Sequence, residues 1–413
     1  MRRIPASRNV KIAVAAGAML ALVIGIVVIR LALSASHSPS AGVHSPTSSA
    51  SASPVPSATS NKPTAQPTSN SSGAIGTWVN ITPPGVSLDF NNPPNNYGTQ
   101  IIQTDPQHSG TVYVGTCYQG IWKTSDGGTT WRKINTGQNG DQLNGRIWGL
   151  ALDRINPQLV WAANGAGGAQ GIWKSTDGGV DWSYTSVNTV NGQTISNDIY
   201  SYTTDPYQAN HVLVTFHTGW NAGRSAAGFL ESFDAGKTWI VHQPPAGSDA
   251  SASYIFFLDD SKTWLLTEGE GYYRTSDGGA SWAKVSDALL EHGSNQVYRA
   301  RNGALYVGAV GALMRSTDDG RSWTAVAPTG HDGYNAVIGD GTYLYAQEAN
   351  TAGNTAGSPQ PYIFSREDDG IHWQAYNGQT FRDGPMSMAI DPATGTVYSS
   401  NWDTGVWKLV PKH

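Results

Sequence analysis

The stretch "KTSDGGTTW", from Lys123 to Trp131, decides the fold because it recurs along the chain. Its frame is a hydroxyl residue, any residue, Asp, any residue, Gly, two further residues and a Trp. The later copies end at Trp182, Trp239, Trp282, Trp323 and Trp373. Successive tryptophans lie 51, 57, 43, 41 and 50 residues apart, a spacing typical of β-propeller blades.

Each copy lies between two short strand signals. The apolar segment Gly120–Lys123 precedes the first copy, and Trp131–Asn135 follows it, so the motif reads as a hairpin turn. A carboxylate beside a hydroxyl can accept hydrogen bonds from turn amides, and Gly permits a positive φ. We therefore predict a structural role for the repeated aspartates Asp126, Asp177, Asp234, Asp277, Asp318 and Asp368.

The last unit lacks one strand signal. Gly405–Lys408 matches the segment before the motif, but no motif follows it, whereas Trp78–Thr82 near the start of the repeat region matches the segment after the motif. We predict that Trp78–Thr82 closes the last blade, which hides the edge strands of the ring. The sequence thus predicts an all-β, single seven-bladed β-propeller over residues 76–413.

The N-terminal 75 residues have a different composition. The low-polarity run from Ile12 to Ile29 follows four basic residues, which predicts a cytoplasmic tail at 1–11 and a transmembrane anchor at 12–33. A cleaved signal peptide ending near Ala32–Ser36 is the alternative, with a secreted product. Residues 34–75 are rich in Ser, Thr and Pro and predict a disordered linker. Both interpretations place the propeller outside the cytoplasm.

Charge and cysteine content exclude several classes of function. The chain has 25 Lys and Arg and 30 Asp and Glu, and every acidic residue follows residue 75. A negative propeller disfavours nucleic acid and most anionic ligands, although a local basic cluster could bind one. Cys117 is the only cysteine, which excludes an intramolecular disulfide and a cysteine-based metal site. We expect a monomer without cofactor or metal.

The repeated frame resembles the Asp-box, or bacterial neuraminidase, repeat, and the resemblance covers nearly all of residues 76–410. It implies a β-propeller but no single function, because sialidases, xyloglucan-cleaving glycosidases, sortilin-type receptors and photosystem II assembly-factor propellers share the repeat. In those families the boxes lie on the face opposite the ligand site.

The enzyme members of that group carry signatures that this chain lacks. The Arg-Ile-Pro motif of sialidases occurs only as Arg3–Pro5, ahead of the predicted anchor. Xyloglucanases carry a catalytic Asp in a Thr-Asp-Val-Gly-Gly-like stretch, where this chain reads Val114–Gly120 with Cys117 at the position of the Asp. A thiol does not readily replace a carboxylate base.

Ligands of a propeller meet the loops between blades and the turns between the two middle strands, because both converge on the axis at one face. Among residues of these loops, the catalytic candidates are Glu268, Glu270, Asp383 and Asp403. The ligand-binding candidates are Tyr118, Trp148, Trp220, Trp402, Arg146 and Arg382. Trp220 and Trp402 lie in Gly- and Asn-rich segments, which favours sugar stacking, whereas Trp148 could instead fill the core.

Two functional hypotheses remain open at this stage. We favour a membrane-anchored extracytoplasmic module that binds a glycan or a protein without catalysis. The alternative is a glycoside hydrolase of the xyloglucanase or sialidase type, which needs two carboxyl groups about 5 to 10 Å apart across the substrate. Loops from different blades can supply such a pair without any sequence signature.

Overall fold

The computed structural model describes residues 76–220, 227–290, 296–327, 333–348 and 359–409. The predicted tail, anchor and linker at residues 1–75 lie outside these ranges. Within them the one helix is the 3₁₀ turn η1 (Gly140–Gln142), so no helix of the described part could span a bilayer.

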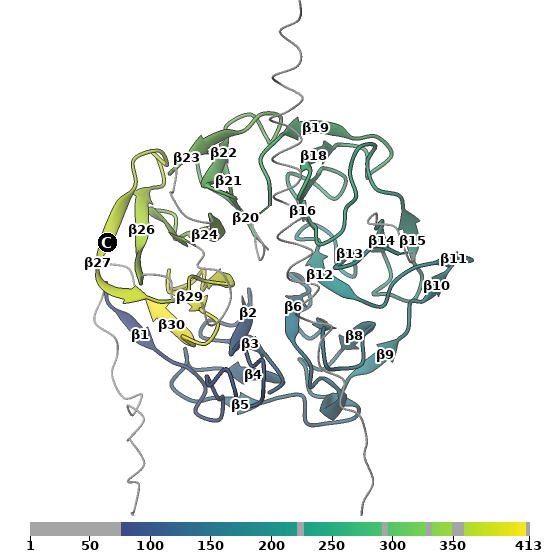
Figure 1. Ribbon diagram of the computed structural model, residues 1–413, viewed down its shortest axis with the longest axis horizontal. Coiled ribbons are helices and arrows are strands. Elements are labelled where there is room, and N and C mark those ends of the chain that lie inside the picture. Colours follow the sequence, from purple (N-terminus) through teal and green to yellow (C-terminus); the bar gives the residue numbers. More distant parts are fainter. Residues whose placement is uncertain (1–75, 221–226, 291–295, 328–332, 349–358, 410–413) are drawn as a thin grey trace, which may run out of the picture. The chain divides into compact units, whose positions relative to one another are not determined.

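Seven four-stranded antiparallel sheets are arranged as the blades of a ring (Figure 1). Blade 1 consists of β2 (Thr99–Thr104), β3 (Val112–Thr116), β4 (Ile121–Thr124) and β5 (Arg132–Lys133), and blade 2 of β6 (Ile147–Leu152), β7 (Val160–Asn164), β8 (Ile172–Ser175) and β9 (Ser183–Thr185). Blade 3 consists of β12 (Ile199–Thr204), β13 (Val212–Phe216), β14 (Phe229–Ser232) and β15 (Ile240–His242). Blade 4 consists of β16 (Tyr254–Phe257), β17 (Trp264–Glu268), β18 (Gly271–Thr275) and β19 (Ala283–Ser286).

Blades 5 to 7 follow the same order from the axis to the rim. Blade 5 consists of β20 (Val297–Arg299), β21 (Leu305–Ala309), β22 (Ala312–Ser316) and β23 (Thr324–Val326). Blade 6 consists of β24 (Tyr334–Gly339), β25 (Tyr343–Glu348), β26 (Gln360–Arg366) and β27 (Gln374–Phe381). Blade 7 consists of β28 (Ser387–Ile390), β29 (Val397–Ser400), β30 (Val406–Leu409) and β1 (Trp78–Asn80). A small extra hairpin, β10 (Thr189–Val190) and β11 (Gln193–Thr194), projects from blade 3's entry loop and was not anticipated from the sequence.

The ring closes through pairing of the first and last strands. In blade 7, β1 pairs antiparallel with β30, with Trp78 opposite Leu409 and Asn80 opposite Trp407. The prediction that the segment beginning at Trp78 supplies the missing strand is therefore confirmed, and so is the count of seven blades. The Trp78 indole is buried and stacks on Tyr362 of blade 6 with ring centroids 4.2 Å apart.

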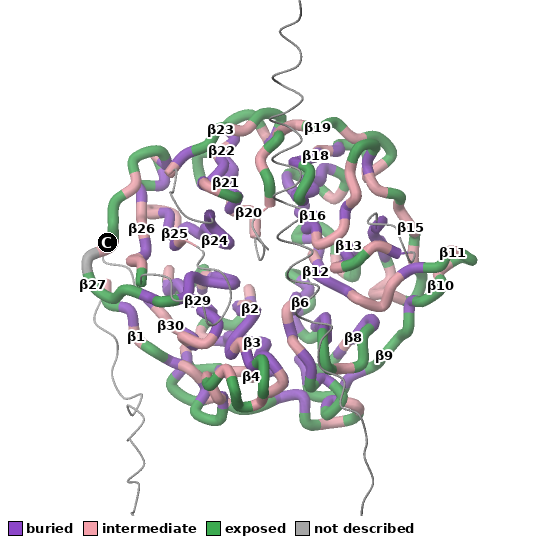
Figure 2. The backbone as a smooth tube through the Cα atoms, in the orientation of Figure 1, coloured by how far each residue is buried: buried purple, intermediate pink, exposed green. Residues whose placement is uncertain are grey.

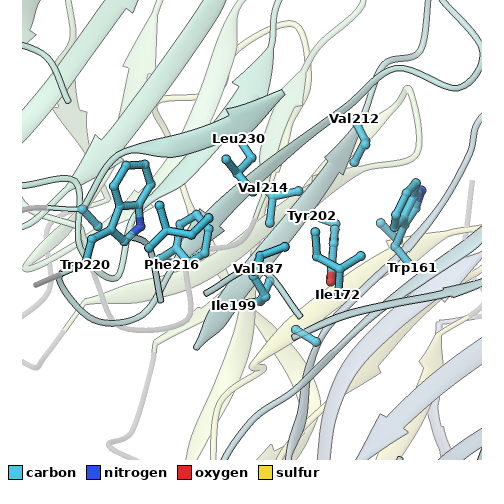
Figure 3. Close-up of a cluster of buried hydrophobic side chains, with 14 of the residues drawn as sticks. Trp161, Ile172, Val187, Ile199, Tyr202, Val212, Val214, Phe216, Trp220 and Leu230 are labelled. Atoms are coloured by element: carbon cyan, nitrogen blue, oxygen red, sulfur yellow. The ribbon is translucent and has the colours of Figure 1, made fainter. Parts of the chain in front are cut away.

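The middle strands are apolar on both faces because each blade packs between two neighbours. All residues of β3, β7 and β13 are buried, whereas β5 and β9 at the rim are exposed, a gradient visible in Figure 2. Between blades 2 and 3 the core includes Trp161, Ile172, Val212 and Val214 (Figure 3). Inner strands are also joined directly, since the Thr204 hydroxyl donates to the carbonyl of Leu152 at 2.7 Å.

The repeated motif forms the turn between the third and fourth strands of a blade. In blade 1 the Thr124 hydroxyl donates to Asp126 Oδ1 at 2.7 Å, and the same carboxylate accepts the amide and hydroxyl of Thr130 at 2.8 and 2.6 Å. Gly128 has a φ of 89°, and a Cβ there would lie 2.7 Å from Ile81, so the turn requires glycine.

Strand direction assigns every loop to one of two faces. The motif turns and the turns between first and second strands lie at one end of the ring, called here the box face. The turns between second and third strands, and the connections between blades, lie at the other end, called the loop face. Antiparallel pairing in all seven blades makes this division strict.

We expect Trp78→Ala to destabilise the ring strongly, because it removes a buried aromatic side chain at the closure. The loss in free energy of unfolding should be about 3–5 kcal/mol, measured by urea denaturation. Ile371→Ala, at a residue 49% exposed, should change stability by less than about 0.5 kcal/mol. Equal effects of the two substitutions would contradict the closure role.

Asp177→Ala should lower stability by about 1–2 kcal/mol, because the Asp177 carboxylate accepts the Ser175 hydroxyl and the amides of Val180 and Asp181. Asp368→Ala is the matched control. That carboxylate pairs with exposed Arg366 rather than with a hydroxyl, so its loss should be smaller. Thermal unfolding of both variants checks this order, and ligand binding should survive both changes.

Candidate functional site

Three of the sequence candidates meet on the loop face of blade 7. Arg382 and Asp383 follow β27, and Asp403 lies in the turn between β29 and β30. Arg382 Nε donates to Asp383 Oδ2 at 3.1 Å, and Arg382 Nη2 contacts Asp403 Oδ1. The Thr404 hydroxyl also donates to Asp383 Oδ2, at 3.2 Å. This group, Arg382, Asp383, Asp403 and Thr404, is called the Arg382 cluster below.

The Arg382 cluster places two buried acids under an exposed cation. The side chains of Asp383 and Asp403 are 0% and 6% exposed, whereas that of Arg382 is 49% exposed. Burial and the neighbouring Asp403 carboxyl together raise the pKa of Asp383 to about 7, against the opposing effect of Arg382. Asp383 Oδ1 is buried without a hydrogen-bond partner. The pair can therefore hold a proton at neutral pH.

A second acid site lies in blade 4. Glu268 ends β17, is fully buried, and accepts the amide of Ala250 at 2.6 Å. Its Oε1 has no hydrogen-bond partner, and burial raises the pKa of Glu268 to about 7, with Asp249 and Glu270 acting in the same direction. Glu270 lies beyond the Gly269 turn and is exposed. The two glutamates therefore do not share one environment.

The structure does not unite the four catalytic candidates. Glu268 belongs to blade 4, whereas Asp383 and Asp403 belong to the loops of blades 6 and 7, on the other side of the ring (Figure 1). Within the Arg382 cluster the two aspartic carboxyl groups are within hydrogen-bonding reach of each other. A pair this close leaves no room for a sugar ring between its members.

An aromatic and basic seam continues from the Arg382 cluster across the closure of the ring. Tyr97 lies edge-on to Trp402 with ring centroids 6.1 Å apart, and the Arg146 guanidinium lies 4.1 Å from the Tyr97 ring centroid. The amide of Thr99 donates to the Trp402 carbonyl at 2.9 Å. Tyr97 was missed by the sequence analysis, although it stands directly before the inner strand of blade 1, where loop residues converge.

Tyr118 and Trp402 occupy turns of this face with left-handed backbones, at φ values of 64° and 51°. Bulky residues rarely adopt this conformation, and such strain is found preferentially at functional sites. Tyr118 is half-buried and contacts the loop of blade 2, where a Cβ on Gly167 would lie 2.7 Å from its ring. Tyr118 and Tyr97 are thus the partly exposed aromatic residues of the seam.

The tryptophans proposed as sugar platforms occupy the interior. Trp402 is 5% and Trp220 is 6% exposed, because each indole packs against a neighbouring aromatic ring, Tyr97 and Phe216 respectively. Trp148 lies in inner strand β6 rather than in a loop, and its Nε1 donates to the Ile199 carbonyl at 2.9 Å. Neither Trp220 nor Trp402 therefore presents an open ring face like that of a stacking platform.

Cys117 is unsuited to replace a catalytic carboxylate. Its side chain is fully buried, with Sγ 3.5 Å from the carbonyl of Asn95. Burial raises the pKa of the Cys117 thiol, although Arg146 opposes the rise. The thiol therefore stays protonated and inert. Among the described residues no group of three or more His, Cys, Asp or Glu side chains is placed to hold a metal ion.

Sequence comparison relates the chain to xyloglucanases at low identity. No family model matches it. It is 27% identical over 280 residues to a xyloglucanase of Hypocrea jecorina. The matched region spans 56% of this chain and 33% of that enzyme. A xyloglucanase of Paenibacillus is 26% identical over 271 residues, which span 54% of this chain and 25% of that enzyme. The matches thus cover about a third or less of these relatives.

Solved structures show the same architecture. The GH74 xyloglucanase of Xanthomonas campestris superposes with a TM-score of 0.55 at 17% identity, covering 80% of this chain and 53% of that one. The structure of YCF48 bound to D1 peptide also superposes with a TM-score of 0.55, at 14% identity. The match covers 81% of this chain and 97% of that one. At these identities the likeness establishes the seven-bladed fold and leaves the function open.

Asp383→Asn should change how stability depends on pH. In the folded protein the pKa of Asp383 lies near 7 instead of its usual 3.8, so the folded state binds the proton more tightly. The free energy of unfolding therefore falls as pH rises from about 4 to 7. The variant should lose this decline, measured by urea denaturation at several pH values.

Asp234→Asn is the control, because the stability contribution of Asp234 changes with pH in the opposite direction to that of Asp383. The Thr238 hydroxyl and amide lower the pKa of Asp234 to about 2, so its contribution is present above pH 4 and is lost as pH falls toward 2. An Asp383→Asn profile parallel to the wild type between pH 4 and 8 would contradict the assignment.

Proposed function

We propose that this protein is a carbohydrate-binding β-propeller, and that its loop face binds a neutral glycan at the seam between blades 7, 1 and 2. The anchor expected at residues 12–33 would hold it outside the cell. The observation that carries the proposal is the Arg382 cluster, which holds an exposed guanidinium over two buried acids at the edge of an aromatic seam.

The side chains at this seam match the chemistry of a neutral sugar. Arg382 and Arg146 are cations with N–H groups for sugar hydroxyls, and Tyr97 and Tyr118 are half-buried rings that can cover an apolar sugar face. The two carboxylates neutralise Arg382, so the cluster does not select for an anion. The low-identity relatives are named xyloglucanases, which supports a neutral polysaccharide ligand.

The same geometry weighs against hydrolysis at this seam. The contacting Asp383 and Asp403 carboxyls lie closer than the roughly 5 to 10 Å separation used by glycosidases. Cys117 is buried and protonated where xyloglucanases carry their catalytic Asp. Binding without turnover is therefore the function that the site supports best.

A glycoside hydrolase is the second candidate, and one observation favours it. Both Asp383 and Glu268 have a pKa raised to about 7 by burial, which is the property of a general acid at neutral pH. A substrate chain would have to reach from blade 7 to blade 4 to lie over both acids, which are buried. A peptide ligand, like the one bound by YCF48, is a further outcome of the binding test.

The test is calorimetric titration of the full-length chain with xyloglucan and sialylated oligosaccharides, with parallel measurement of released reducing ends. We expect the neutral oligosaccharides to bind without turnover. Arg382→Gln should weaken binding about tenfold or more, because it removes a charge-assisted donor, and Tyr118→Ala should weaken it about two- to tenfold.

Arg366→Gln on the box face is the matched control and should leave affinity unchanged, and melting temperatures check that every variant folds. Release of reducing ends that stops in Glu268→Gln or Asp383→Asn would replace the binding module with the hydrolase. Unchanged affinity in both Arg382→Gln and Tyr118→Ala would remove the seam as the site.

A further inference from the structure

A cavity lies on the axis of the ring, toward the box face. It has a volume of about 460 Å³, and residues from the inner strands of all seven blades line it. Small-molecule sites in proteins are typically of roughly 300 to 1,000 Å³. The Arg382 cluster does not contribute to this cavity, so it is separate from the glycan site proposed above.

One lining position repeats from blade to blade, two residues after the end of the inner strand. Pro106, Pro206 and Pro392 occupy it in blades 1, 3 and 7, whereas blade 2 has Arg154. The preceding residue is an Asp whose Oδ1 accepts the amide two residues later in all four turns. The turn therefore does not need an arginine, and proline serves in the other three blades.

Arg154 has no counter-ion within the part of the chain that the structure describes. Its nearest acid in sequence, Asp153, already accepts the amides of Ile155, Asn156 and Asn210. Arg299, the other cation of the lining, pairs with two aspartates. Arg154 thus contributes the uncompensated positive charge of the cavity.

The position of Arg154 makes that charge available to a ligand. Arg154 is exposed to solvent, and no carboxylate acts on its pKa. No carboxylate competes for the Arg154 guanidinium, so an anion that enters the cavity can pair with it. A guanidinium binds carboxylate and phosphate oxygens with two parallel hydrogen bonds.

The remainder of the lining is neutral and mixed. Gln103 and Thr203 are polar, Phe256 and Met388 are apolar, and Gln296 has a buried Oε1 without a hydrogen-bond partner. A ligand with one anionic group, a small apolar body and a hydroxyl donor would satisfy all of these groups. An inorganic ion alone would leave the apolar part of the cavity unfilled.

We propose that this axial cavity is a binding site for a small organic anion, and that Arg154 holds its carboxylate or phosphate group. The overall negative charge of the propeller argues against general affinity for anions, so binding depends on this one residue. The site gives the protein a second ligand on the face opposite the glycan seam.

The test is calorimetric titration of the full-length chain with benzoate and phenyl phosphate, with benzyl alcohol as the neutral analogue. We expect at least one of the two anions to bind and benzyl alcohol not to bind, and the comparison of the anions separates carboxylate from phosphate. Arg154→Gln should weaken anion binding about 10- to 100-fold. Arg132→Gln, at an exposed residue of β5, should leave it unchanged.

Melting temperatures keep the test decisive. Because Arg154 makes no ion pair, Arg154→Gln should melt at or above the wild-type temperature without ligand. A lower melting temperature would indicate a structural role and overturn the proposal. It would also be overturned by equal anion affinity in Arg154→Gln and wild type, by equal binding of benzyl alcohol, or by no binding of either anion.

Discussion

The pairing of β1 with β30 is the interaction on which the rest of the structure depends. It joins residues more than 300 positions apart in the sequence and completes the sheet of blade 7, so that this blade has four strands like the other six. It also fixes the candidate glycan site. The Thr99 amide reaches the Trp402 carbonyl only when blade 1 lies beside blade 7, and a Cβ on Gly98 would lie 2.4 Å from that same carbonyl oxygen. The closure and the seam are one packed unit.

The two faces of the ring use acidic residues in opposite ways. On the box face the Asp234 carboxylate is nearly surrounded by donors, and its pKa falls to about 2 because the Thr238 hydroxyl and amide favour the ionised form. On the loop face Asp383 has fewer donors and a buried oxygen with no partner, so burial dominates and its pKa rises to about 7. Identical side chains thus stabilise turns at one end and provide protonatable groups at the other.

Departures from the repeat identify positions that the fold alone does not require. Arg154 occupies a place where three blades have proline, and the resemblance to xyloglucanases predicts a carboxylate where this chain has Cys117. The structure gives these departures different meanings. Arg154 is open to a cavity, whereas Cys117 is enclosed by protein and inert. The repeat pattern alone could not separate the two, because burial depends on residues from neighbouring blades.

The sequence by itself determined the blade count, the closing strand and the turn position of the repeated motif, because these follow from local patterns at fixed spacing. It also named Arg382, Asp383 and Asp403 as loop residues. Only the tertiary structure showed that these three meet while Glu268 lies in another blade, and that Trp220 and Trp402 pack inside the protein. Loop contacts join residues far apart in the chain and have no period in the sequence. The packing of neighbouring blades, rather than local propensity, therefore decided which candidate side chains are exposed, paired or protonated.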